Sequence, residues 1–311
     1  MPLITQPIRY LDPKFDLTFK RLFGNNPRLL KSFLNALLPL PADAPIDTLE
    51  YLSGEHTPNL PSFEKYSIVD VKCKDTKGRI FTVEMQLSWA ESFKKRLVFG
   101  GCQAFVKQLG RGINYSKLQP VYALALVNEI FEHHSDEFYH HYKFTHQSDA
   151  NCELGCLEFV LVELPKFKAE TPIEKELMGL WLQFMNETGK IEAQIPDLKL
   201  QSNPEISEAM TQMQESAFNV AEKESYDQYT DKWRTHHTML NDAEEKGKAE
   251  GKAEGKAEGK VEGKVEGKAE GKAEGAVQKS LDIAKSMKAK GLDDAMIMDL
   301  TGLSAADLFR L

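Results

Sequence analysis

The sequence predicts an α/β layer fold with a mixed central sheet. Residues 69–88 read as strand, turn and strand, because apolar and polar side chains alternate on both sides of a turn sequence. Residues 119–128 (QPVYALALVN) are almost continuously apolar, which is typical of a strand buried on both faces. Segments with helical spacing lie before and after these strands, and this alternation indicates helices packed on a sheet.

Two helices are expected before the hairpin. Residues 16–23 (DLTFKRLF) and 26–40 (NPRLLKSFLNALLPL) both carry apolar residues at helical spacing. In the second segment Asn26 followed by Pro27 is a helix start signal, and Pro39 ends the apolar run.

The turn of the hairpin decides which side chains face each other. The sequence DTKG at residues 75–78 favours a turn, and its glycine can supply the positive φ of a bulged three-residue loop. Such a loop pairs Asp75 with Arg79 and, counting back along both strands, Asp70 with Glu84. A two-residue loop would mix polar and apolar side chains on one face, so we expect the three-residue loop.

The expected pairing places two carboxylates, Asp70 and Glu84, side by side. Opposed side chains in an antiparallel pair lie about 5 Å apart at Cβ, where like charges repel. A divalent cation between them, a raised carboxylate pKa or exposure at a sheet edge would each relieve the repulsion. Gln86 and the backbone carbonyl of Met85 add further oxygen atoms, so the set resembles what a metal-dependent phosphodiesterase needs.

Further helices and one more strand follow the hairpin. Residues 89–109 form a long helical pattern interrupted by Gly100 and Gly101, which suggests close backbone packing or a kink. Residues 156–167 (CLEFVLVELPKF) read as a strand ended by proline, and residues 171–187 as an amphipathic helix. The histidine-rich segment between the two later strands reads as polar surface, because its spacing completes no zinc site.

A tetrapeptide repeat, KAEG with two KVEG variants, fills residues 246–275. Its period of four places like charges at i,i+4, so no favourable ion pair forms at that spacing. Its eight glycines would each destabilise a helix by about 1 kcal/mol relative to alanine, roughly 8 kcal/mol in all. These points favour a flexible spacer, and a glycine-striped helix stabilised by oligomeric packing is the alternative.

The residues after the repeat form short amphipathic helices. They break at Gly291 and Gly302, and DLTGLSAADL at residues 299–308 looks like a helix-turn-helix. Its second helix has only Arg310 as a basic residue, which favours a tail for protein interaction or dimerisation over a DNA reader. We therefore expect four parts: a globular domain at 1–202, a helical extension at 203–245, the spacer at 246–275 and a helical tail at 276–311.

Composition narrows the function further. The 311-residue chain is 41% hydrophobic, has a net charge of −8 and contains no apolar run long enough for a membrane span. Residues 1–112 are nevertheless basic, with 16 Lys and Arg against 11 Asp and Glu, which weakly favours an anionic substrate there. The N-terminus lacks a signal-peptide pattern, and four cysteines without zinc spacing indicate reduced thiols, so we expect a cytoplasmic protein.

Taken together, the motifs resemble one known family. An acid followed on the next strand of a hairpin by ExK is the signature of the PD-(D/E)XK nuclease superfamily. The version with ExQ, preceded by an N-terminal DxxFKxxFG motif, resembles the Rpn (YhgA-like) recombination-promoting nuclease and putative transposase family. The matching residues are Asp16–Gly24, Asp70, Glu84–Gln86, Arg96, Gln108, Tyr115–Val121 and Glu163–Phe167. The KAEG tract and the TGLS tail are also similar to that family.

The resemblance implies a restriction-endonuclease-like α/β/α core with a mixed sheet, followed by a helical, repeat-containing C-terminal tail. It also implies Mg²⁺-dependent cleavage of DNA, with Asp70 and Glu84 as metal carboxylates and with Mn²⁺ and Ca²⁺ as alternative ions. By analogy Asp16, on the first helix, would either support the metal carboxylates from behind or bridge to the metal, although an ordinary ion pair with Lys20 also explains it. A homodimer or larger oligomer through the tail would suit double-strand cutting.

Gln86 departs from the lysine of the superfamily. A neutral amide can orient water but cannot stabilise a developing anion as lysine would. Lys72 is expected on the face of Asp70, diagonally within reach of Glu84, so we hypothesise that it supplies the missing charge. An inactive nuclease fold that acts through self-association is the alternative function, and a nuclease acting on RNA is a weaker one.

Overall fold

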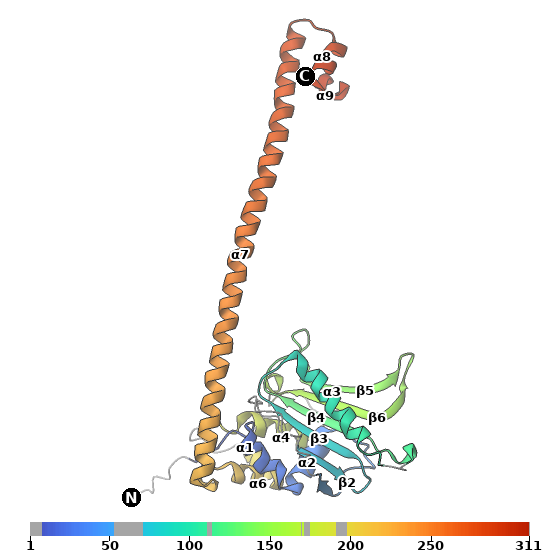
Figure 1. The fold of residues 1–311 in the computed structure, drawn as a ribbon, viewed down its shortest axis with the longest axis vertical. Coiled ribbons are helices and arrows are strands. Elements are labelled where there is room, and N and C mark those ends of the chain that lie inside the picture. Colours follow the sequence, from blue (N-terminus) through green and yellow to red (C-terminus); the bar gives the residue numbers. More distant parts are fainter. Residues whose placement is uncertain are drawn as a thin grey trace, which may run out of the picture. The chain divides into compact units, whose positions relative to one another are not determined.

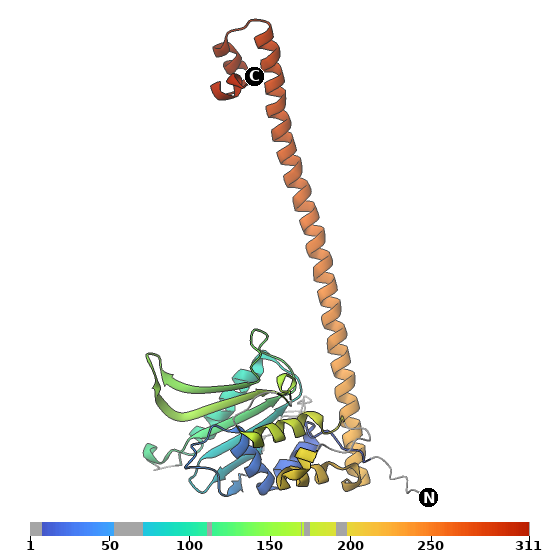
Figure 2. The same cartoon turned by 180° about the vertical axis from the view of Figure 1, so that it is seen from behind.

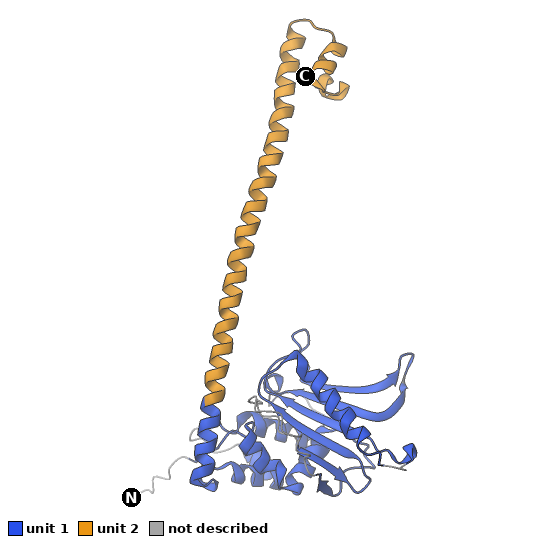
Figure 3. Cartoon of the chain, viewed as in Figure 1, with its two compact units in different colours: residues 1–231 blue, residues 232–311 orange. Residues whose placement is uncertain are grey.

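The computed structural model describes residues 8–52, 71–110, 114–168, 170, 175–190 and 198–310. Within them the chain forms two compact units, residues 1–231 and residues 232–311 (Figure 3). The first unit holds the sheet and the core, and the second holds the repeat and the C-terminal helices.

The first unit is built on a six-stranded mixed sheet with the strand order β1-β2-β3-β4-β6-β5 (Figure 1). β3, β4 and β6 are parallel to one another, and the remaining neighbours pair antiparallel. The mixed sheet predicted from the sequence is thus confirmed. The strands are β1 (Leu49–Tyr51), β2 (Val71–Asp75), β3 (Ile80–Gln86), β4 (Val121–Val127), β5 (Tyr139–His146) and β6 (Asp149–Glu163).

Helices cover both faces of the sheet. Helix α3 (Glu91–Val106) lies along one face, over β3, β4 and β6 (Figure 1). The helices packed beside β1 and β2 belong to the other layer, which Figure 2 shows from behind. That layer comprises α1 (Asp16–Phe19), the π-helical turn η1 (Lys20–Gly24), α2 (Pro27–Leu37), α4 (Glu176–Glu187), α5 (Leu198–Ser202) and α6 (Pro204–Met213).

The two layers have separate apolar cores. Under α3, the buried side chains of β3, β4 and β6 pack against Phe93, Leu97 and Ala104. On the other side an aromatic cluster joins the N-terminal helices to α4, with Phe33 and Trp181 5.3 Å apart and nearly perpendicular. Both rings are fully buried. Aromatic pairs of this geometry add to the free energy gained by burial alone.

The hairpin has the predicted three-residue loop. Gly78 has φ +82°, Asp75 N donates to Arg79 O at 3.1 Å, and the ladder continues with Lys72 opposite Thr82. Asp75 and Arg79 are buried together, with Arg79 Nε 2.7 Å from Asp75 Oδ2. The strand ladder ends, among the described residues, at Val71 opposite Val83, and Asp70 lies outside the described residues.

The later strands differ from the prediction in extent. β4 is buried at every position, as its apolar sequence predicted. The histidine-rich segment, expected to be polar surface, contains the edge strand β5, and β6 begins at Asp149 rather than near residue 156. An edge strand has one exposed side and can carry many polar residues, so its sequence lacks the apolar run that predicts a strand. Short 3₁₀ turns follow or precede the strands: η2 (Tyr115–Lys117) and η3 (Leu164–Lys166).

The first unit continues past the expected boundary at residue 202. Helix α6 buries Ile206, Ala209, Met210 and Met213, and it packs on α2 and α4. A 3₁₀ turn, η4 (Glu215–Ala217), then leads to the next helix. Residues expected to lead out of the core therefore form part of it.

The repeat is helical. Helix α7 (Val220–Ala289) spans 70 residues and includes all of residues 246–275, so the flexible spacer favoured from the sequence is not the conformation found. Helical sequence on both sides explains the difference, because extending a helix requires no new nucleation, and Lys, Ala and Glu are good helix formers. The repeat is exposed throughout.

Two short helices, α8 (Asp294–Thr301) and α9 (Ala305–Phe309), follow α7 in the second unit. Gly302, with φ +68°, ends α8, and Ser304 caps α9 through a capping box with Asp307. Ala284, Ile297 and Leu308 form their small core. None of the described helices has the length and apolar character required to cross a membrane.

Candidate functional site

The predicted site residues on β3 face α3. Glu84 and Gln86 lie opposite Ala125 and Val127 of β4, whose side chains belong to the core under α3. Glu84 is only 6% exposed, although it carries a carboxylate. A carboxylate in such a place requires compensating interactions, because burial disfavours its charged form.

Helix α3 runs antiparallel to β3 and matches its spacing. A Cβ atom at Gly100 would lie 4.0 Å from Glu84 Oε1, and Arg96 Nη2 donates to Gln86 Oε1 at 2.9 Å. Four residues of helix advance about 6 Å, and two residues of strand about 6.7 Å. Arg96 and Gly100 therefore lie above Gln86 and Glu84 in turn, and the glycine leaves space over the buried carboxylate.

Gln86 is held at both ends of its amide. Its Nε2 donates to Ser88 O at 2.8 Å, while its Oε1 accepts from Arg96. The guanidinium of Arg96 also lies 5.0 Å from the ring centroid of Phe93, in cation–π contact. The amide and the guanidinium thus position each other at the end of β3.

Met85 and Lys72 take the positions that the register implies. The Met85 side chain is buried on the opposite face. Gln86 O accepts from Asn128 N on the β4 side, so the carbonyl of Met85, one residue earlier, points to the β2 side. Lys72 lies opposite Thr82, two residues from Glu84 along β3.

Asp16 is paired within its own segment. Lys20 Nζ lies 2.8 Å from Asp16 Oδ1 and donates a hydrogen bond to Oδ2 at 3.0 Å. The described residues contain no group of three or more His, Cys, Asp or Glu side chains that could hold a metal ion, and Asp70 is not among them.

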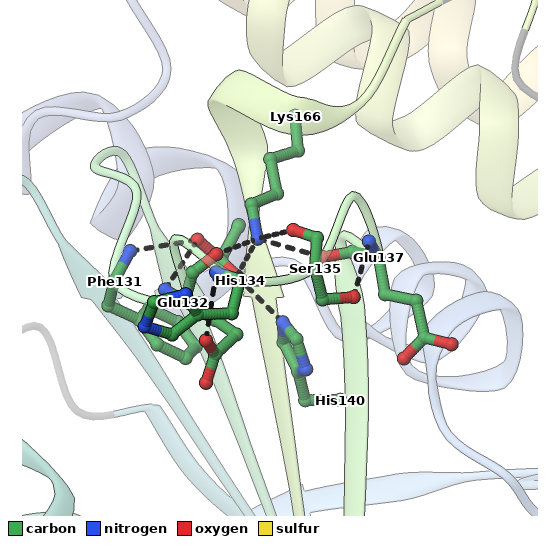
Figure 4. A network of polar contacts seen from close by, with 8 residues as sticks. Phe131, Glu132, His134, Ser135, Glu137, His140 and Lys166 are labelled. Atoms are coloured by element: carbon green, nitrogen blue, oxygen red, sulfur yellow. Dashed lines mark hydrogen bonds and ion pairs between the residues drawn. The ribbon is translucent and has the colours of Figure 1, made fainter.

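A buried polar network lies beside this end of the sheet (Figure 4). Glu163 has no solvent exposure, and its Oε1 lies 2.7 Å from His140 Nε2 and 2.8 Å from Lys166 Nζ. Its Oε2 accepts from the backbone N–H groups of Phe131 and Glu132. Burial raises the pKa of Glu163, but these hydrogen bonds together outweigh burial and hold the pKa below its ordinary value.

The network fixes the segment between β4 and β5. Lys166 Nζ also donates to the carbonyls of Glu132, Ser135 and Glu137. In the same segment Phe131 stacks on Trp89, with ring centroids 4.2 Å apart, just before α3 begins. In the sequence, only the family resemblance points to Glu163 and Lys166, and their spacing of three residues is the local signal for a pair.

Comparison with known protein families agrees with this geometry. Residues 13–243 match the family described as PD-(D/E)XK nuclease family transposase. The chain belongs to this nuclease family. The match contains β2, β3, α3 and the Glu84-Met85-Gln86 motif on the central strand.

A second family match covers the C-terminal helices. Residues 277–311 match the family described as Rpn/YhgA-like nuclease family, C-terminal HTH domain. This confirms the Rpn (YhgA-like) resemblance and the helix-turn-helix reading of the tail, and it indicates DNA binding by a segment that the sequence analysis favoured for protein interaction. Searches of the curated proteins and of the solved structures each found no match.

Members of the PD-(D/E)XK nuclease family generally use divalent metal ions. The Glu84 region fits such an ion chemically. It offers a buried carboxylate and a carbonyl turned toward β2, both oxygen donors of the kind that hard cations prefer. Gly100 places no side chain over Glu84, and a Cβ atom there would meet Glu84 Oε1 at 4.0 Å, an ordinary van der Waals contact.

Proposed function

We propose that this protein is a metal-dependent DNA endonuclease that hydrolyses phosphodiester bonds and acts in recombination or transposition. The observation that carries the proposal is the placement of Glu84. It is a buried carboxylate on the central strand of a nuclease-family sheet, under a glycine and next to the Gln86–Arg96 pair.

The metal ligands we propose are the carboxylates of Asp70 and Glu84 and the backbone carbonyl of Met85. Val71 pairs with Val83 across the hairpin. In the sequence Asp70 comes directly before Val71, and Glu84 comes directly after Val83. Mg²⁺ is the proposed ion, with Mn²⁺ and Ca²⁺ as alternatives. A bound cation at such a site polarises a phosphate and lowers the pKa of water.

The chain's own side chains have separate roles in this proposal. Gln86, fixed by Ser88 and Arg96, orients the attacking water through its amide. Lys72 is a candidate for the positive charge beside the carboxylates, because it lies on the adjacent strand near Glu84. Asp16 is proposed as a supporting acid, in competition with its ion pair to Lys20.

DNA is the proposed substrate and partner. The helix-turn-helix family match of the tail supports DNA binding, and self-association through the tail remains a further proposal. Two sites in a homodimer would suit cleavage of both strands. The proposed location is the cytoplasm, where such a protein meets DNA.

Cleavage of supercoiled plasmid tests the proposal. Wild type should nick or linearise the plasmid with Mg²⁺ or Mn²⁺, and EDTA should abolish the activity. Glu84→Gln should reduce the rate by at least ~100-fold, because it removes a charge that holds the cation at nearly constant side-chain volume. Glu50→Gln is the matched control, since Glu50 is an exposed strand glutamate paired with Lys74.

Three outcomes would contradict the proposal. Metal-dependent cleavage at the wild-type rate by Glu84→Gln would show that the active site is not at Glu84 on β3. A wild-type protein that binds plasmid but never cleaves it in any of the three ions would favour the inactive, self-associating fold. Competition by duplex RNA stronger than that by duplex DNA would move the substrate to RNA.

A further inference from the structure

We infer that Arg96, presented by α3 and held by Gln86, supplies the positive charge that contacts the scissile phosphate. This inference rests on the proposed nuclease function. Gln86 stands where the superfamily signature has lysine and carries no charge of its own. Its Oε1 instead accepts a hydrogen bond of 2.9 Å from Arg96 Nη2, which brings a guanidinium to the same place.

Two neighbours contact the guanidinium of Arg96. Nη2 donates a hydrogen bond to Gln86 Oε1, and Cζ lies 5.0 Å from the centroid of the Phe93 ring. Phe93 itself is buried and therefore fixed in position. An arginine held in this way loses little further conformational freedom on binding a ligand.

Arg96 also retains the capacity to bind an anion. A guanidinium has five N–H donors, and only one bond from Arg96, to Gln86, is formed with the described residues. No carboxylate among the described residues forms an ion pair with it, although the buried carboxylate of Glu84 lies one strand step from Gln86. Bidentate donation to phosphate oxygens is the interaction for which the planar guanidinium is best suited.

The position of Arg96 follows from the spacing of helix on strand. Arg96 precedes Gly100 by one turn, and Gly100 lies over Glu84. A phosphate bound to a cation on Glu84 would therefore meet Arg96 from the α3 side. Lys72 approaches from β2 instead, so the two candidate cations lie on different elements and can be tested separately.

Rates of plasmid cleavage by single and double variants test the inference. Arg96→Gln should lower the cleavage rate by about 100-fold. Arg96→Lys should lower it by less, because lysine keeps the positive charge but lacks the two parallel N–H donors of the guanidinium. Gln86→Lys should restore cleavage in the Arg96→Gln background to within about tenfold of the Gln86→Lys single variant. Lys95→Gln removes a neighbouring exposed cation of α3 and is the matched control, expected near the wild-type rate.

The salt dependence of DNA binding provides a readout that a purely structural role would not change. DNA binding in Ca²⁺ should show a salt dependence reduced by about one unit in Arg96→Gln and not in Arg96→Lys.

The outcomes separate this inference from the function it rests on. If Glu84→Gln is inactive while Arg96→Gln cleaves and binds like wild type, the inference is wrong and the nuclease site stands. A 100-fold loss in Lys72→Gln with none in Arg96→Gln would assign the charge to Lys72. If Glu84→Gln stays active, the proposed site fails first, and unchanged salt dependence in Arg96→Gln would then overturn the inference as well.

Discussion

Glu163 shows what a buried ionised residue needs in this fold. It has no solvent exposure, yet Lys166, His140 and two backbone N–H groups supply donors to both of its oxygens. Lys166 in turn satisfies three backbone carbonyls. Removing one member of this network leaves the remaining polar groups buried without that partner. The loss in folding free energy then exceeds what the deleted interaction contributed on its own.

The lowered pKa of Glu163 predicts acid sensitivity. Because the folded-state pKa lies below the ordinary value of 4.5, its stabilising contribution is present above pH 4.5 and is lost as pH falls through the folded-state pKa. Urea unfolding between pH 7 and pH 3 should show this loss for wild type. Glu163→Gln should flatten that part of the pH profile.

Lys166→Met is the stronger perturbation of the same network. It leaves the buried carboxylate of Glu163 without its cation, so we expect a loss of about 3–5 kcal/mol in the free energy of unfolding at pH 7. Lys168→Met serves as the nearby control, since Lys168 is exposed. Equal effects of the two substitutions would show that the network does not stabilise the fold.

Among the elements, α3 contains two adjacent glycines with different roles. A Cβ atom at Gly101 would lie 2.9 Å from Phe159 Cε1, closer than such atoms approach, whereas one at Gly100 would make ordinary contact with Glu84. Both changes to alanine gain helix propensity equally. Their difference therefore isolates the packing of the helix on the sheet.

We expect Gly101→Ala to be less stable than Gly100→Ala by about 1–3 kcal/mol, the usual range for overpacking a core. Thermal and urea unfolding of the two variants measures this difference. Gly100→Ala should fold normally but cleave more slowly, because its methyl group occupies the space above Glu84. Two equally stable variants would contradict the close approach of α3 to Phe159.

The sequence was informative where local chemistry decides the structure. Gly78 determines the turn, and with it the strand register down to Lys72 opposite Thr82. The buried strand β4 was equally clear from its unbroken apolar run. In contrast, β5 was missed because an edge strand keeps polar residues on its exposed side, and its pairing with β6 is a long-range property.

The candidate site was predictable only in part. Glu84 and Gln86 follow from a strand pattern together with a family signature. The pairing of Gln86 with Arg96 does not, because it depends on how α3 packs on β3 after the chain folds. Asp70 lies outside the described residues, so its pairing with Glu84 stays a prediction.

At the scale of the whole molecule, α7 combines favourable helix formers with a regular series of glycines. Within the second unit, a Cβ atom at any repeat glycine from Gly247 to Gly275 would meet nothing within 4 Å. The helix alone therefore gives no packing reason for the glycines. Oligomeric packing along the stripe, the alternative raised by the sequence, is the explanation to be tested.

Replacing the repeat glycines by alanine distinguishes an isolated helix from a helix that packs against other copies of the chain along the glycine stripe. For an isolated helix, each change should stabilise by about 1 kcal/mol, so the melting of the repeat followed by circular dichroism should shift upward. Melting of the first unit should stay unchanged. A downward shift, or dissociation of an oligomer measured by light scattering, would show that the glycines allow chains to approach closely.

The alignment of α3 with β3 also constrains the length of the connector between them. Residues 87–90 link the end of β3 to the start of α3. One inserted residue would turn the helix by about 100° relative to the sheet, since the α-helix has 3.6 residues per turn. Arg96 would swing away from Gln86, and a bulky side chain would replace Gly100 over Glu84. Natural variants of this chain should therefore tolerate changes of identity in the connector far better than changes of its length.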